Sequence, residues 1–421
     1  MDQILNRMTA SQTSAHDSWI AEAIDRRVPN HSLEGGFYHR DDVYRHDVER
    51  IWRRGWLFAG HTCEVARPGD FFALEVDGDP LLIIRGDDGA VRALSNVCRH
   101  RGSLLCDAER GHAGRIVCPY HQWSYGRDGK LLTARGMHQG FDRSPYGLAA
   151  AHLRELEGLI YISLADEPPD FEPARRLLGP AARPQGLERA RVAHAIDYEV
   201  AGNWKLVWEN NRECYHCDVN HPEYIRANFD RYNAEDTPPR VRSEMESAIR
   251  GSDARWRDAD LAVNHRNTGM APFPAGATWY SANRTPLAPG YVSESLDGRR
   301  VAPLMGSYPD AGVGTLRLRT LPNFWNHSSC DHAVSTRLLP GGPQRTHVRV
   351  TWLVHEEAEE GKDYQLETLL PFWQRTSEQD WALVKHAQRG VNARAYRPGP
   401  FSATKEYNVE AFLRWYLAQV E

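Results

Sequence analysis

The sequence predicts an α+β protein in which a small all-β unit precedes a larger unit of mixed helices and strands. Short apolar, β-branched runs separated by turn dipeptides dominate residues 40–165, whereas runs of helical and strand period follow one another in residues 166–421. The length of 421 residues is enough for two domains of roughly 100 to 200 residues or one large domain. We therefore divide the chain into an N-terminal helical segment (1–39) that packs on the second unit, the all-β unit (40–165) and the mixed unit (166–421).

The composition excludes several classes of protein. With 25% charged residues and no apolar run near the roughly 18 residues of a bilayer helix, the sequence indicates a soluble protein with no membrane partner. The net charge of -5 argues against nucleic acid as the main partner. Residues 1–16 lack the apolar stretch of a signal peptide, so we expect a cytoplasmic location. Seven cysteines, an odd number, stand beside 19 histidines, which favours metal-binding or catalytic thiols over a disulfide framework.

The first predicted elements are an amphipathic helix and a series of antiparallel strands. Apolar side chains between residues 37 and 56 recur every three to four positions, as on a helix that covers a core. Turn signals at Asp77-Gly78-Asp79-Pro80 and Asp87-Asp88-Gly89 then separate strand-like runs. The predicted strands are residues 71–76, 81–85, 91–96 and 158–164.

The second unit begins after the turn-rich residues 167–170. Apolar periodicity predicts a helix over 204–220 and further helices over 364–388 and 409–420. Strand-like runs cover 315–321, 333–339 and 347–355. The proline- and glycine-rich residues 272–314 predict a long loop, and loops of that length often carry function.

Two short motifs in the all-β unit form a candidate metal site. Cys98-Arg99-His100 and Cys118-Pro119-Tyr120-His121 give the pattern C-x-H-x17-C-x2-H. Each pair lies in a loop between strand-like segments, where two side chains can converge on one metal. Two thiolates on one iron and two imidazoles on the other would hold a 2Fe-2S cluster of raised reduction potential, suited to one-electron delivery. The spacing alone also allows a structural zinc site.

A second group of ligand-type side chains lies in the predicted helix 204–220. Glu209, Glu213 and His216 recur at i, i+4 and i+7, which places them on one helical face. His221 precedes Pro222, which disfavours helical backbone at His221 and lets its ring turn back to the same site. Two imidazoles and one carboxylate on one side of a metal leave positions open for dioxygen, as in non-haem iron(II) oxygenases.

Asp380 is the candidate for the missing carboxylate. It lies in an apolar stripe with Trp373, Val384, Ala387 and Val391 on the predicted helix 364–388. A carboxylate on a core-facing stripe is costly unless it is paired or binds a metal. An ion pair is the alternative role for this residue.

The C-x-x-C motif formed by Cys214 and Cys217 could indicate zinc or redox chemistry. On one helical turn, however, both thiols cannot join His216 and His221 around a single metal. We interpret them as buried thiols.

The residues of both sites resemble those of a known family. The runs Asn96–Gly102 and Cys118–Gly126 are similar to the loops of Rieske iron-sulfur domains. Together with the second group, they resemble the catalytic (alpha) subunit of the Rieske non-haem iron oxygenases, from about residue 38 to the C-terminus. The resemblance implies an all-β Rieske domain plus a helix-grip catalytic domain, an antiparallel sheet wrapped by helices. It also implies that the 2Fe-2S cluster is held by Cys98, His100, Cys118 and His121, and a mononuclear Fe(II) by His216, His221 and Asp380.

The resemblance further implies partners and a linking residue. Family members are usually homotrimers, some with added small subunits, in which the cluster of one subunit faces the iron of its neighbour. Glu213 is then the acidic residue that links the two centres. Because the chain shows no convincing dinucleotide-binding fingerprint, we expect electrons from NAD(P)H through a separate flavin and iron-sulfur reductase.

The local context indicates a branch of the family. Many members that dihydroxylate aromatic rings have Asp where this chain has Glu213. Residues 209–217 look more like the branch that oxidises quaternary ammonium compounds such as glycine betaine, carnitine and stachydrine. Residues 389–391 and 395–400 resemble that branch too. The implied activity is O2-dependent N-demethylation of a quaternary ammonium compound with formaldehyde release. The alternatives are an aromatic-ring or aromatic-acid hydroxylase of the same family, and a non-enzymatic zinc or iron-sulfur binding protein.

A quaternary ammonium group cannot donate hydrogen bonds, so proteins hold it against aromatic faces. Aromatic residues in the loop-rich part of the second unit are candidates for such a cage, although each is more often a core residue. They are Trp279, Tyr280, Tyr291, Phe324 and Trp325.

Overall fold

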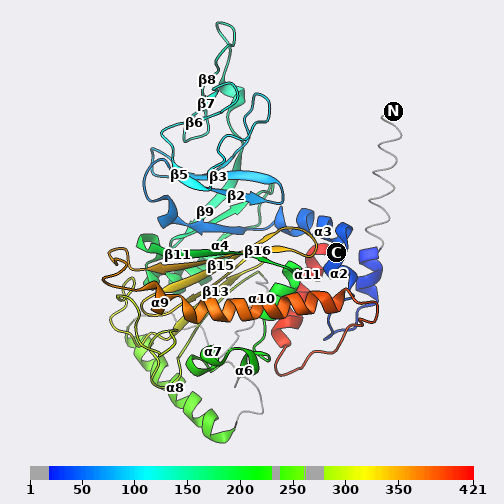
Figure 1. Cartoon of the computed structure of the whole chain (residues 1–421), viewed down its shortest axis with the longest axis vertical. Helices are drawn as coiled ribbons and strands as arrows, with labels where there is room; N and C mark the ends of the chain where they lie inside the picture. The colour runs from blue at the N-terminus through cyan, green and yellow to red at the C-terminus, as the bar shows by residue number, and fades with distance from the viewer. Residues whose placement is uncertain (1–18, 230–237, 260, 262–278) are drawn as a thin grey trace.

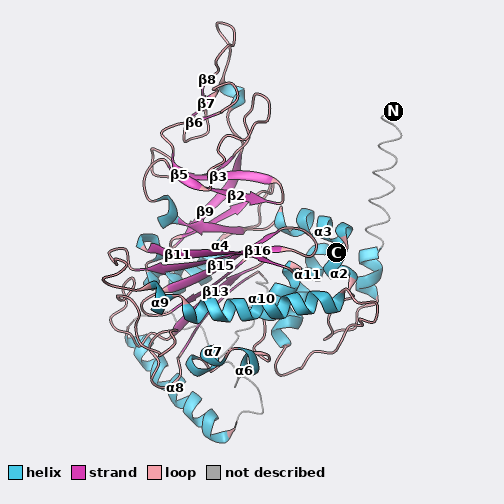
Figure 2. Ribbon diagram, in the orientation of Figure 1, coloured by secondary structure: helices cyan, strands magenta, loops and turns pink. Residues whose placement is uncertain are grey.

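Antiparallel sheets organise the part of the chain that the computed structural model describes, which comprises residues 19–229, 238–259, 261 and 279–421 (Figure 1). The first unit contains a sheet of order β1-β10-β9-β4-β3-β2-β5 and, at its outer end, a small sheet of order β6-β7-β8 (Figure 2). Their strands are β1 (Leu57–His61), β2 (Asp70–Val76), β3 (Asp79–Arg85), β4 (Val91–Ser95), β5 (Arg110–His112), β6 (Ile116–Val117), β7 (Ser124–Tyr125), β8 (Leu131–Thr133), β9 (Ala150–Leu156) and β10 (Leu159–Ser163).

The hairpin between β2 and β3 confirms the turn signal in the sequence. Val76 pairs with Asp79, so the loop consists of Asp77 and Gly78 alone. Both residues have positive φ angles, 45° and 85°. Two-residue loops of this kind match the right-handed twist of the strands, and Asp-Gly is a favoured sequence for them.

The second unit contains a sheet of order β11-β16-β15-β14-β13-β12. Its strands are β11 (Arg191–Val200), β12 (Tyr280–Thr285), β13 (Thr315–Thr320), β14 (Phe324–Ser328), β15 (Ala333–Pro340) and β16 (Thr346–Val354). The helices are α2 (Gly36–His39), α3 (Asp41–Asp47), α4 (Glu172–Ala182), α5 (Trp204–Asn211), α6 (Cys217–Asn220), α7 (Pro222–Ala227), α8 (Pro239–Asp258), α9 (Leu366–Leu369), α10 (Pro371–Val391) and α11 (Tyr407–Val420). Short helical segments are η1 (Val48–Trp52), η2 (Thr62–Val65), η3 (Ser144–Tyr146), η4 (Arg183–Gln185) and η5 (Leu187–Arg189).

The two faces of this sheet pack against different parts of the chain. Leu316, Leu318 and Phe324 join a core with α4 and with Phe58 and Tyr161 from β1 and β10. The first unit therefore packs on this face. The long helix α10 crosses the opposite face, and α5 lies between α10 and the sheet (Figure 1). This arrangement is the predicted antiparallel sheet wrapped by helices.

The predicted helix over 204–220 is wrong in its second half. The helix α5 ends at Asn211, and a non-helical stretch separates it from α6. The Glu213 carboxylate accepts hydrogen bonds from the backbone N–H groups of Tyr215 and His216, which competes with helical bonding. Glu209 therefore does not share a face with Glu213 and instead accepts a hydrogen bond from Tyr38 Oη at 2.9 Å.

The predicted loop over 272–314 also needs correction. It contains β12, a full strand of the catalytic sheet, while residues 272–278 lie outside the described residues. The polar Ser281, Asn283 and Arg284 hide this strand from apolar periodicity, because they are buried together with Tyr280 and Ala282 and leave no alternation of apolar and polar residues.

The described N-terminal residues pack on the second unit. Residues 19–25 are helical, and Ile20, Ala23 and Phe37 contribute to the core that includes α11. The Arg27 guanidinium lies 2.5 Å from the Glu410 carboxylate of α11. None of the helices in the described part of the chain combines the length and apolar character that a membrane crossing requires.

Candidate active site and metal centres

The two loops of the first motif have the same backbone conformation. The Cys98 N–H donates to Ser103 O at 2.8 Å, and the Cys118 N–H donates to Trp123 O at 2.8 Å. In each loop the residue four positions after the cysteine donates back to the cysteine carbonyl and has a positive φ, 71° at Gly102 and 61° at Gln122. The loops are thus a matched pair at the end of the first unit, each presenting one cysteine and one histidine.

The side chains on these loops suit an iron-sulfur cluster. Cys98 and Cys118 are buried, and the rings of His100 and His121 lie 4.6 Å apart. Among the described residues, His121 Nδ1 is buried and has no hydrogen-bond partner, as expected of an atom that faces a metal. Burial opposes ionisation of the Cys118 thiol, but hydrogen bonds from the backbone of Tyr120 and His121 hold its pKa below the usual value. The donor set therefore fits the cluster that the sequence predicts.

Tyr125 contacts this group of donors. Its hydroxyl accepts a hydrogen bond from the Arg99 N–H at 3.0 Å and lies 3.3 Å from Cys98 Sγ. Because the Tyr125 oxygen accepts from the Arg99 amide, the Tyr125 hydroxyl can donate its proton to Cys98 Sγ. Hydrogen bonds to cluster sulfurs help to set the reduction potential.

The second group of side chains converges on one point. His221 Nε2 lies 3.1 Å from His216 Nε2 and 3.0 Å from Asp380 Oδ1, and His216 Nε2 lies 3.3 Å from the same oxygen. Ligands about 2.1 Å from a divalent ion and at right angles to one another would be about 3.0 Å apart. Asp380 comes from α10, more than 150 positions from the histidines in the sequence, yet the structure brings it to them.

Each histidine is oriented by a hydrogen bond at its other ring nitrogen. His216 Nδ1 lies 2.5 Å from Glu213 Oε1, and His221 Nδ1 lies 2.6 Å from Gln379 Oε1. Gln379 in turn donates from Nε2 to Glu223 Oε1 at 3.2 Å. Such partners fix the ring orientation and make the imidazole a stronger ligand. The sequence analysis did not identify Gln379, although it directly precedes Asp380.

The electrostatics of this group favour a bound cation. Burial disfavours the charged form of His216, but Asp380 and Glu213 raise its pKa to about 10. Burial alone would raise the pKa of Asp380, yet the two histidines hold it below its usual range. Two carboxylates thus face the imidazoles, and their charge suits a divalent metal.

A cavity opens beside the three converging side chains. The rest of its lining comes from α5, α7, β13, β14 and α10 and from residues 213–217. These lining residues are polar, aromatic or disulfide-bonded: Asn210, Asn211, Glu213, Cys214, Cys217, Tyr224, Arg319, His327, Trp373 and Thr376. The rings of Tyr224 and Trp373 lie 5.7 Å apart, and His327 lies 4.3 Å from Trp373. Burial lowers the pKa of His327 to about 4, so its ring is uncharged at neutral pH.

The five aromatic candidates do not line this cavity in the part of the chain that the structure describes. Tyr280 and Phe324 lie in the core on the other face of the sheet, and Trp325 packs edge-on against Trp208 at 5.2 Å. Tyr291 packs against the main core. The core interpretation therefore fits these four residues, and Tyr224 and Trp373 are the aromatic residues at the site.

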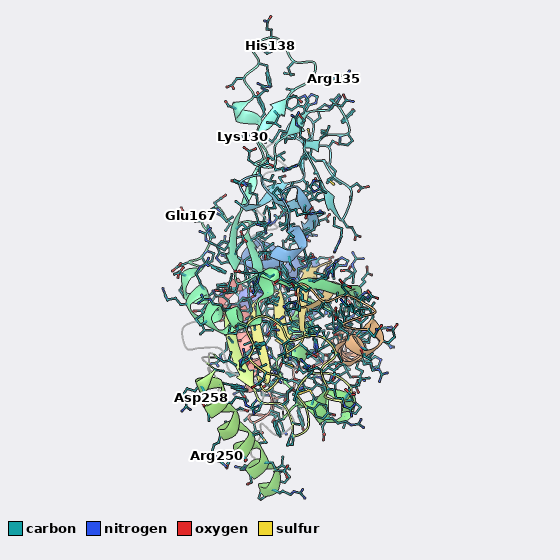
Figure 3. The ribbon with its side chains drawn as sticks, turned by 90° about the vertical axis from the view of Figure 1, so that its left-hand side faces the viewer. Lys130, Arg135, His138, Glu167, Arg250 and Asp258 are labelled. Carbon is teal, nitrogen blue, oxygen red and sulfur yellow. A yellow bond between two sulfur atoms is a disulfide. The ribbon has the colours of Figure 1, made fainter. Side chains whose placement is uncertain are left out.

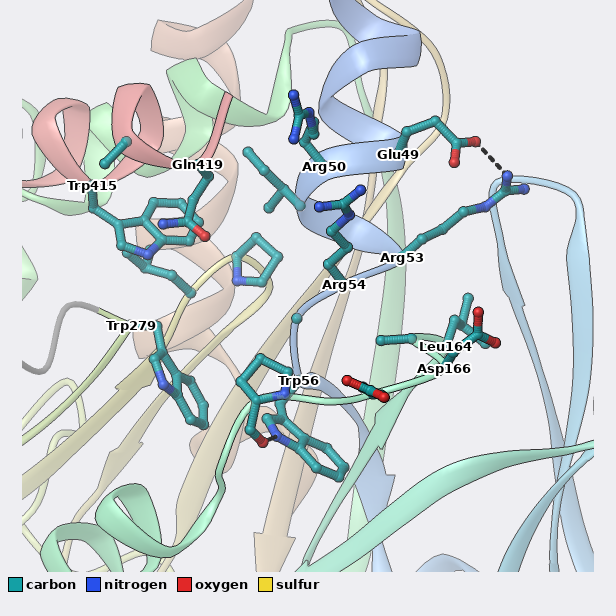
Figure 4. Close-up of a pocket in the computed structure, with 18 of the residues that line it drawn as sticks. Glu49, Arg50, Arg53, Arg54, Trp56, Leu164, Asp166, Trp279, Trp415 and Gln419 are labelled. Carbon is teal, nitrogen blue, oxygen red and sulfur yellow. Dashed lines mark hydrogen bonds and ion pairs between the residues drawn. The ribbon is translucent and has the colours of Figure 1, made fainter. Parts of the chain in front are cut away.

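Trp279 lines a separate cleft where η1, β10 and α11 meet. This cleft has a volume of about 870 Å³, and Figure 4 shows its basic and aromatic side chains, among them Arg50, Arg54, Trp56 and Trp415. It contains none of the eight side chains predicted to bind metal or link the centres. It is therefore distinct from the iron-site cavity.

Cys214 and Cys217 form a disulfide, so their interpretation as two thiols is wrong. Their Cα atoms are 4.9 Å apart, close enough for the bond, because the backbone between α5 and α6 turns rather than continuing as a helix. Tyr215 and His216 lie between the two bonded cysteines, so the disulfide restricts the backbone of the segment that carries His216.

The fold and the two sites define a class of protein. An all-β domain with paired cysteine-histidine loops, followed by a helix-covered antiparallel sheet with a two-histidine, one-carboxylate cluster, is the architecture of an oxygenase with a Rieske cluster and a mononuclear non-haem iron.

Comparison with known proteins identifies the family. Residues 187–421 match the family "Ring hydroxylating alpha subunit (catalytic domain)", and residues 55–152 match the "Rieske [2Fe-2S] domain". The chain belongs to the ring-hydroxylating alpha subunit family of Rieske oxygenases. It therefore carries a Rieske [2Fe-2S] domain and a catalytic domain of the type that holds the mononuclear iron. Members of this family work with a separate reductase, and multimeric assembly is typical of them.

Several individual proteins are similar over most of the chain. The glycine betaine monooxygenase oxygenase subunit of Chromohalobacter salexigens is 38% identical over 96% of this chain and 91% of its own length. That of Pseudomonas aeruginosa is 38% identical over 94% and 90%. The crystal structure of the quaternary ammonium Rieske monooxygenase CntA in complex with an inhibitor superposes with a TM-score of 0.70 at 21% identity, covering 93% of this chain and 96% of that one. Naphthalene 1,2-dioxygenase superposes with 0.63 at 18% identity, covering 93% of each chain.

Proposed function

We propose that this chain is the oxygenase component of an enzyme that removes an N-methyl group from a quaternary ammonium compound such as glycine betaine. The observation that carries the proposal is the cavity beside His216, His221 and Asp380, which is also lined by the aromatic rings of Tyr224 and Trp373. Aromatic faces attract an ammonium group that cannot form hydrogen bonds. The similarity to glycine betaine monooxygenase subunits over nearly the whole chain supports the same substrate class.

In this proposal the residues divide into two ligand sets and their supports. Cys98, His100, Cys118 and His121 hold the 2Fe-2S cluster, and His216, His221 and Asp380 hold the mononuclear Fe(II). When bound, the cluster supplies single electrons and the Fe(II) supplies the place where dioxygen is reduced. Glu213 and Gln379 hold the two imidazoles in the orientation that a single ion requires. Trp373 and Tyr224 position the methyl groups beside that ion and exclude water.

The overall reaction balances with one dioxygen and two electrons. One oxygen atom enters a C–H bond of an N-methyl group, and the other leaves as water with two protons and two electrons. The resulting hydroxymethyl ammonium loses its hydroxyl proton, the C–N bond breaks with its electron pair going to nitrogen, and formaldehyde and a tertiary amine are released.

The partners follow from the same proposal. A flavin and iron-sulfur reductase delivers the electrons of NAD(P)H, and the chain works in the cytoplasm, where NAD(P)H is available. The chain assembles as a homotrimer in which the cluster of one subunit serves the iron of the next, with Glu213 between them. In support, β6 and β7 lie near one end of the long axis of the chain, and α6 lies in the opposite half, on the far side of α10 and the catalytic sheet (Figure 1).

Formaldehyde release tests the proposal. The purified protein, loaded with iron and cluster, is incubated with NADH, a surrogate reductase and a panel of glycine betaine, carnitine, stachydrine and benzoate-type aromatic acids. We expect NADH-dependent formaldehyde from at least one betaine. Hydroxylation of an aromatic acid with no turnover of any betaine would instead support the aromatic hydroxylase, for which the partial match to biphenyl 2,3-dioxygenase subunit alpha is the precedent. Zinc without acid-labile sulfide in the natively purified protein would contradict any oxygenase function.

A further inference from the structure

The Cys214–Cys217 disulfide forms part of the wall of the iron-site cavity. Both cysteines are buried and line this cavity together with His216 and His221. Tyr215, which lies between the two cysteines in the chain, has an exposed side chain. The disulfide is therefore close both to the metal-binding side chains and to the surface of the chain, and the proposed reaction assigns no task to it.

The sulfur of Cys217 is close to the metal-binding nitrogens. Cys217 Sγ lies 4.0 Å from His216 Nε2. One donor atom each from His216, Cys217 and His221 lie within 4.8 Å of one another, and in the described part of the chain this group does not include Cys214. Two ligands of a tetrahedral zinc ion, a sulfur at about 2.3 Å and a nitrogen at about 2.1 Å, are about 3.6 Å apart. A modest side-chain movement would therefore make Cys217 a ligand.

The disulfide withholds this sulfur from the metal. A thiolate is the form of cysteine that binds metals, and a sulfur in a disulfide carries no such charge. While the bond is intact, His216, His221 and Asp380 leave positions open for dioxygen. A Cys217 thiolate would add a fourth donor and complete the closed tetrahedral set of nitrogen, oxygen and sulfur ligands that zinc favours. The oxidation state of one bond thus decides between an open and a closed metal site.

We propose that Cys217 is a redox-controlled metal ligand. The disulfide keeps the site open for iron and dioxygen, and its reduction converts the site into a closed zinc site without oxygenase activity. This inference rests on the proposed function and adds a regulation of the same site. It agrees with the proposed cytoplasmic location, because the disulfides that form in the cytoplasm are usually transient, catalytic or redox-sensing.

The chemistry of the switch is thiol–disulfide exchange with a dithiol. One thiolate of the dithiol attacks a sulfur of the Cys214–Cys217 bond, which breaks, and the second thiol of the dithiol releases the protein from the mixed disulfide. The dithiol leaves as a disulfide, and the two cysteines have gained two electrons and two protons. When Cys217 then binds zinc, its thiol proton passes to solvent.

The test measures metal binding in both oxidation states of the wild-type protein. The protein keeps its cluster, a chelator removes the mononuclear iron, and a phosphine reduces the disulfide; mass spectrometry of the alkylated Cys214–Cys217 peptide counts the thiols before and after. Because one more donor joins, we expect reduction to tighten zinc binding about 100-fold and Fe(II) binding about 10-fold or less. X-ray absorption at the zinc edge should show one sulfur ligand in the reduced protein and none in the oxidised protein.

Two single variants separate the ligand role from the loss of the bond. Cys214→Ser and Cys217→Ser both lack the disulfide, but only Cys214→Ser keeps the Cys217 thiol. We expect Cys214→Ser to bind zinc as tightly as the reduced wild type, with one sulfur ligand and without any reductant. We expect Cys217→Ser to bind zinc about 100-fold more weakly and not to respond to reduction. Cys63→Ser removes a thiol outside the cavity lining and is the control, which should respond to reduction as wild type does.

Three results would overturn the inference. They are equal zinc affinities in Cys214→Ser and Cys217→Ser, a reduced wild type with no sulfur ligand on zinc, and an air-purified wild type without the disulfide. The last two need wild-type protein alone, so they apply even where a variant does not fold. Formaldehyde release by the oxidised, iron-loaded protein is measured alongside. A protein that turns over no betaine removes the proposed function, while the zinc measurements still decide the ligand role of Cys217.

Discussion

At the scale of single residues, the orientation of His216 and His221 is set by the hydrogen bond that each ring makes through Nδ1. Glu213 and Gln379 each accept from a ring Nδ1, so both Nε2 atoms are directed to the point that Asp380 also reaches. A hydrogen bond at one ring nitrogen is also common in buried structural histidines. What favours a metal site is that the two remaining Nε2 atoms and Asp380 Oδ1 then lie 3.0–3.3 Å from one another.

The ligand role of His216 can be tested by truncation. We expect His216→Ala to lose the mononuclear iron and to lower turnover by about 100-fold or more, because two donors no longer hold the ion. The cluster lies at the other end of the chain and should keep its visible spectrum and acid-labile sulfide. Iron analysis together with formaldehyde release measures both effects. His386→Ala, at an exposed position on α10, is the control and should retain full iron content. Unchanged iron and turnover in His216→Ala would show that this residue is not a ligand.

Glu213 is expected to act in electron transfer rather than in metal binding. It accepts from His216 and lies beside the exposed Tyr215, which places it between the iron site and the surface. In Glu213→Gln we expect both metals and substrate binding to remain, while the single-turnover rate falls about 10- to 100-fold. Rapid mixing of the pre-reduced, substrate-bound protein with O2 measures this rate. Glu378→Gln on the exposed side of α10 is the control. A wild-type single-turnover rate in Glu213→Gln would contradict the linking role.

Tyr125 should tune the cluster. Its hydroxyl lies 3.3 Å from Cys98 Sγ, and a hydrogen bond to sulfur stabilises the more negative, reduced cluster. Tyr125→Phe should therefore lower the reduction potential by about 40–60 mV, the equivalent of about 1–1.4 kcal/mol for one electron. Voltammetry of the purified protein measures the shift. Tyr146→Phe, whose ring stacks on Phe141 in the same region, should leave the potential unchanged. An equal shift in both variants would assign the effect to packing.

Proximity of ligand-type side chains can be predicted from the sequence where they are close in the chain. The pairs Cys98/His100, Cys118/His121 and His216/His221 have spacings that a short loop or turn can direct to one ion. In the structure the rings of His100 and His121 lie 4.6 Å apart, and the Nε2 atoms of His216 and His221 lie 3.1 Å apart. Residues whose role depends on packing between distant elements have no such spacing. Arg319, Tyr224 and His327 were therefore not predicted, and aromatic residues from the loop-rich region were chosen in their place.

At the scale of elements, the segment between α5 and α7 shows why periodicity failed where the chemistry is densest. The pattern of residues 204–220 suits a helix, but the Glu213 carboxylate caps backbone amides and the Cys214–Cys217 disulfide closes a turn. The apolar pattern of the sequence also failed to predict the strands β12 and β14, for a related reason. The strands β12 and β14 carry Asn283, Asn326 and His327 on buried faces, so they lack the alternation of apolar and polar residues that marks a half-buried strand.

The helices α3, α5 and α11 are joined by one buried carboxylate. Asp47 accepts hydrogen bonds from Lys205 Nζ, from Trp204 Nε1 at 3.1 Å and from Tyr416 Oη at 2.8 Å, and the Asp47 and Lys205 side chains are both 0% exposed. Asp47→Ala leaves an uncompensated buried ammonium, so we expect a loss of about 3–5 kcal/mol in unfolding free energy. Chemical denaturation followed by tryptophan fluorescence measures the loss.

The double variant separates the charge from the packing. Because a buried pair costs desolvation, Asp47→Leu combined with Lys205→Met should be less destabilised than Asp47→Ala alone. A double variant as unstable as the sum of its two single changes would mean that the ion pair is not the source of the effect.

At the scale of the whole molecule, the positions of the two centres constrain how electrons reach the iron. The Rieske loops lie at the end marked by Lys130, Arg135 and His138 in Figure 3, and α8 with Arg250 and Asp258 extends from the other end. The catalytic sheet and α10 lie between the Rieske sheet and α6 (Figure 1). Both family matches lie on this one chain, at residues 55–152 and 187–421, so the separation is a property of each subunit. A cluster and an iron on different subunits are therefore the pair expected to exchange electrons.

Mixed oligomers test this arrangement directly. One chain carries Cys98→Ser and lacks a working cluster, and a second chain carries Asp380→Ala and lacks the mononuclear iron; each should be inactive alone. Co-expressed with different affinity tags and purified through both tags, the mixed trimers should regain formaldehyde release, because an intact cluster then faces an intact iron across some interfaces. A trimer that holds both kinds of chain has one productive interface out of three, whichever chain is in excess, so we expect the doubly purified trimers to show about one third of wild-type activity. Separately purified variants mixed without subunit exchange are the control and should stay inactive. If the mixed trimers are as inactive as either parent, electrons pass within one chain, and the trimeric arrangement proposed here is wrong.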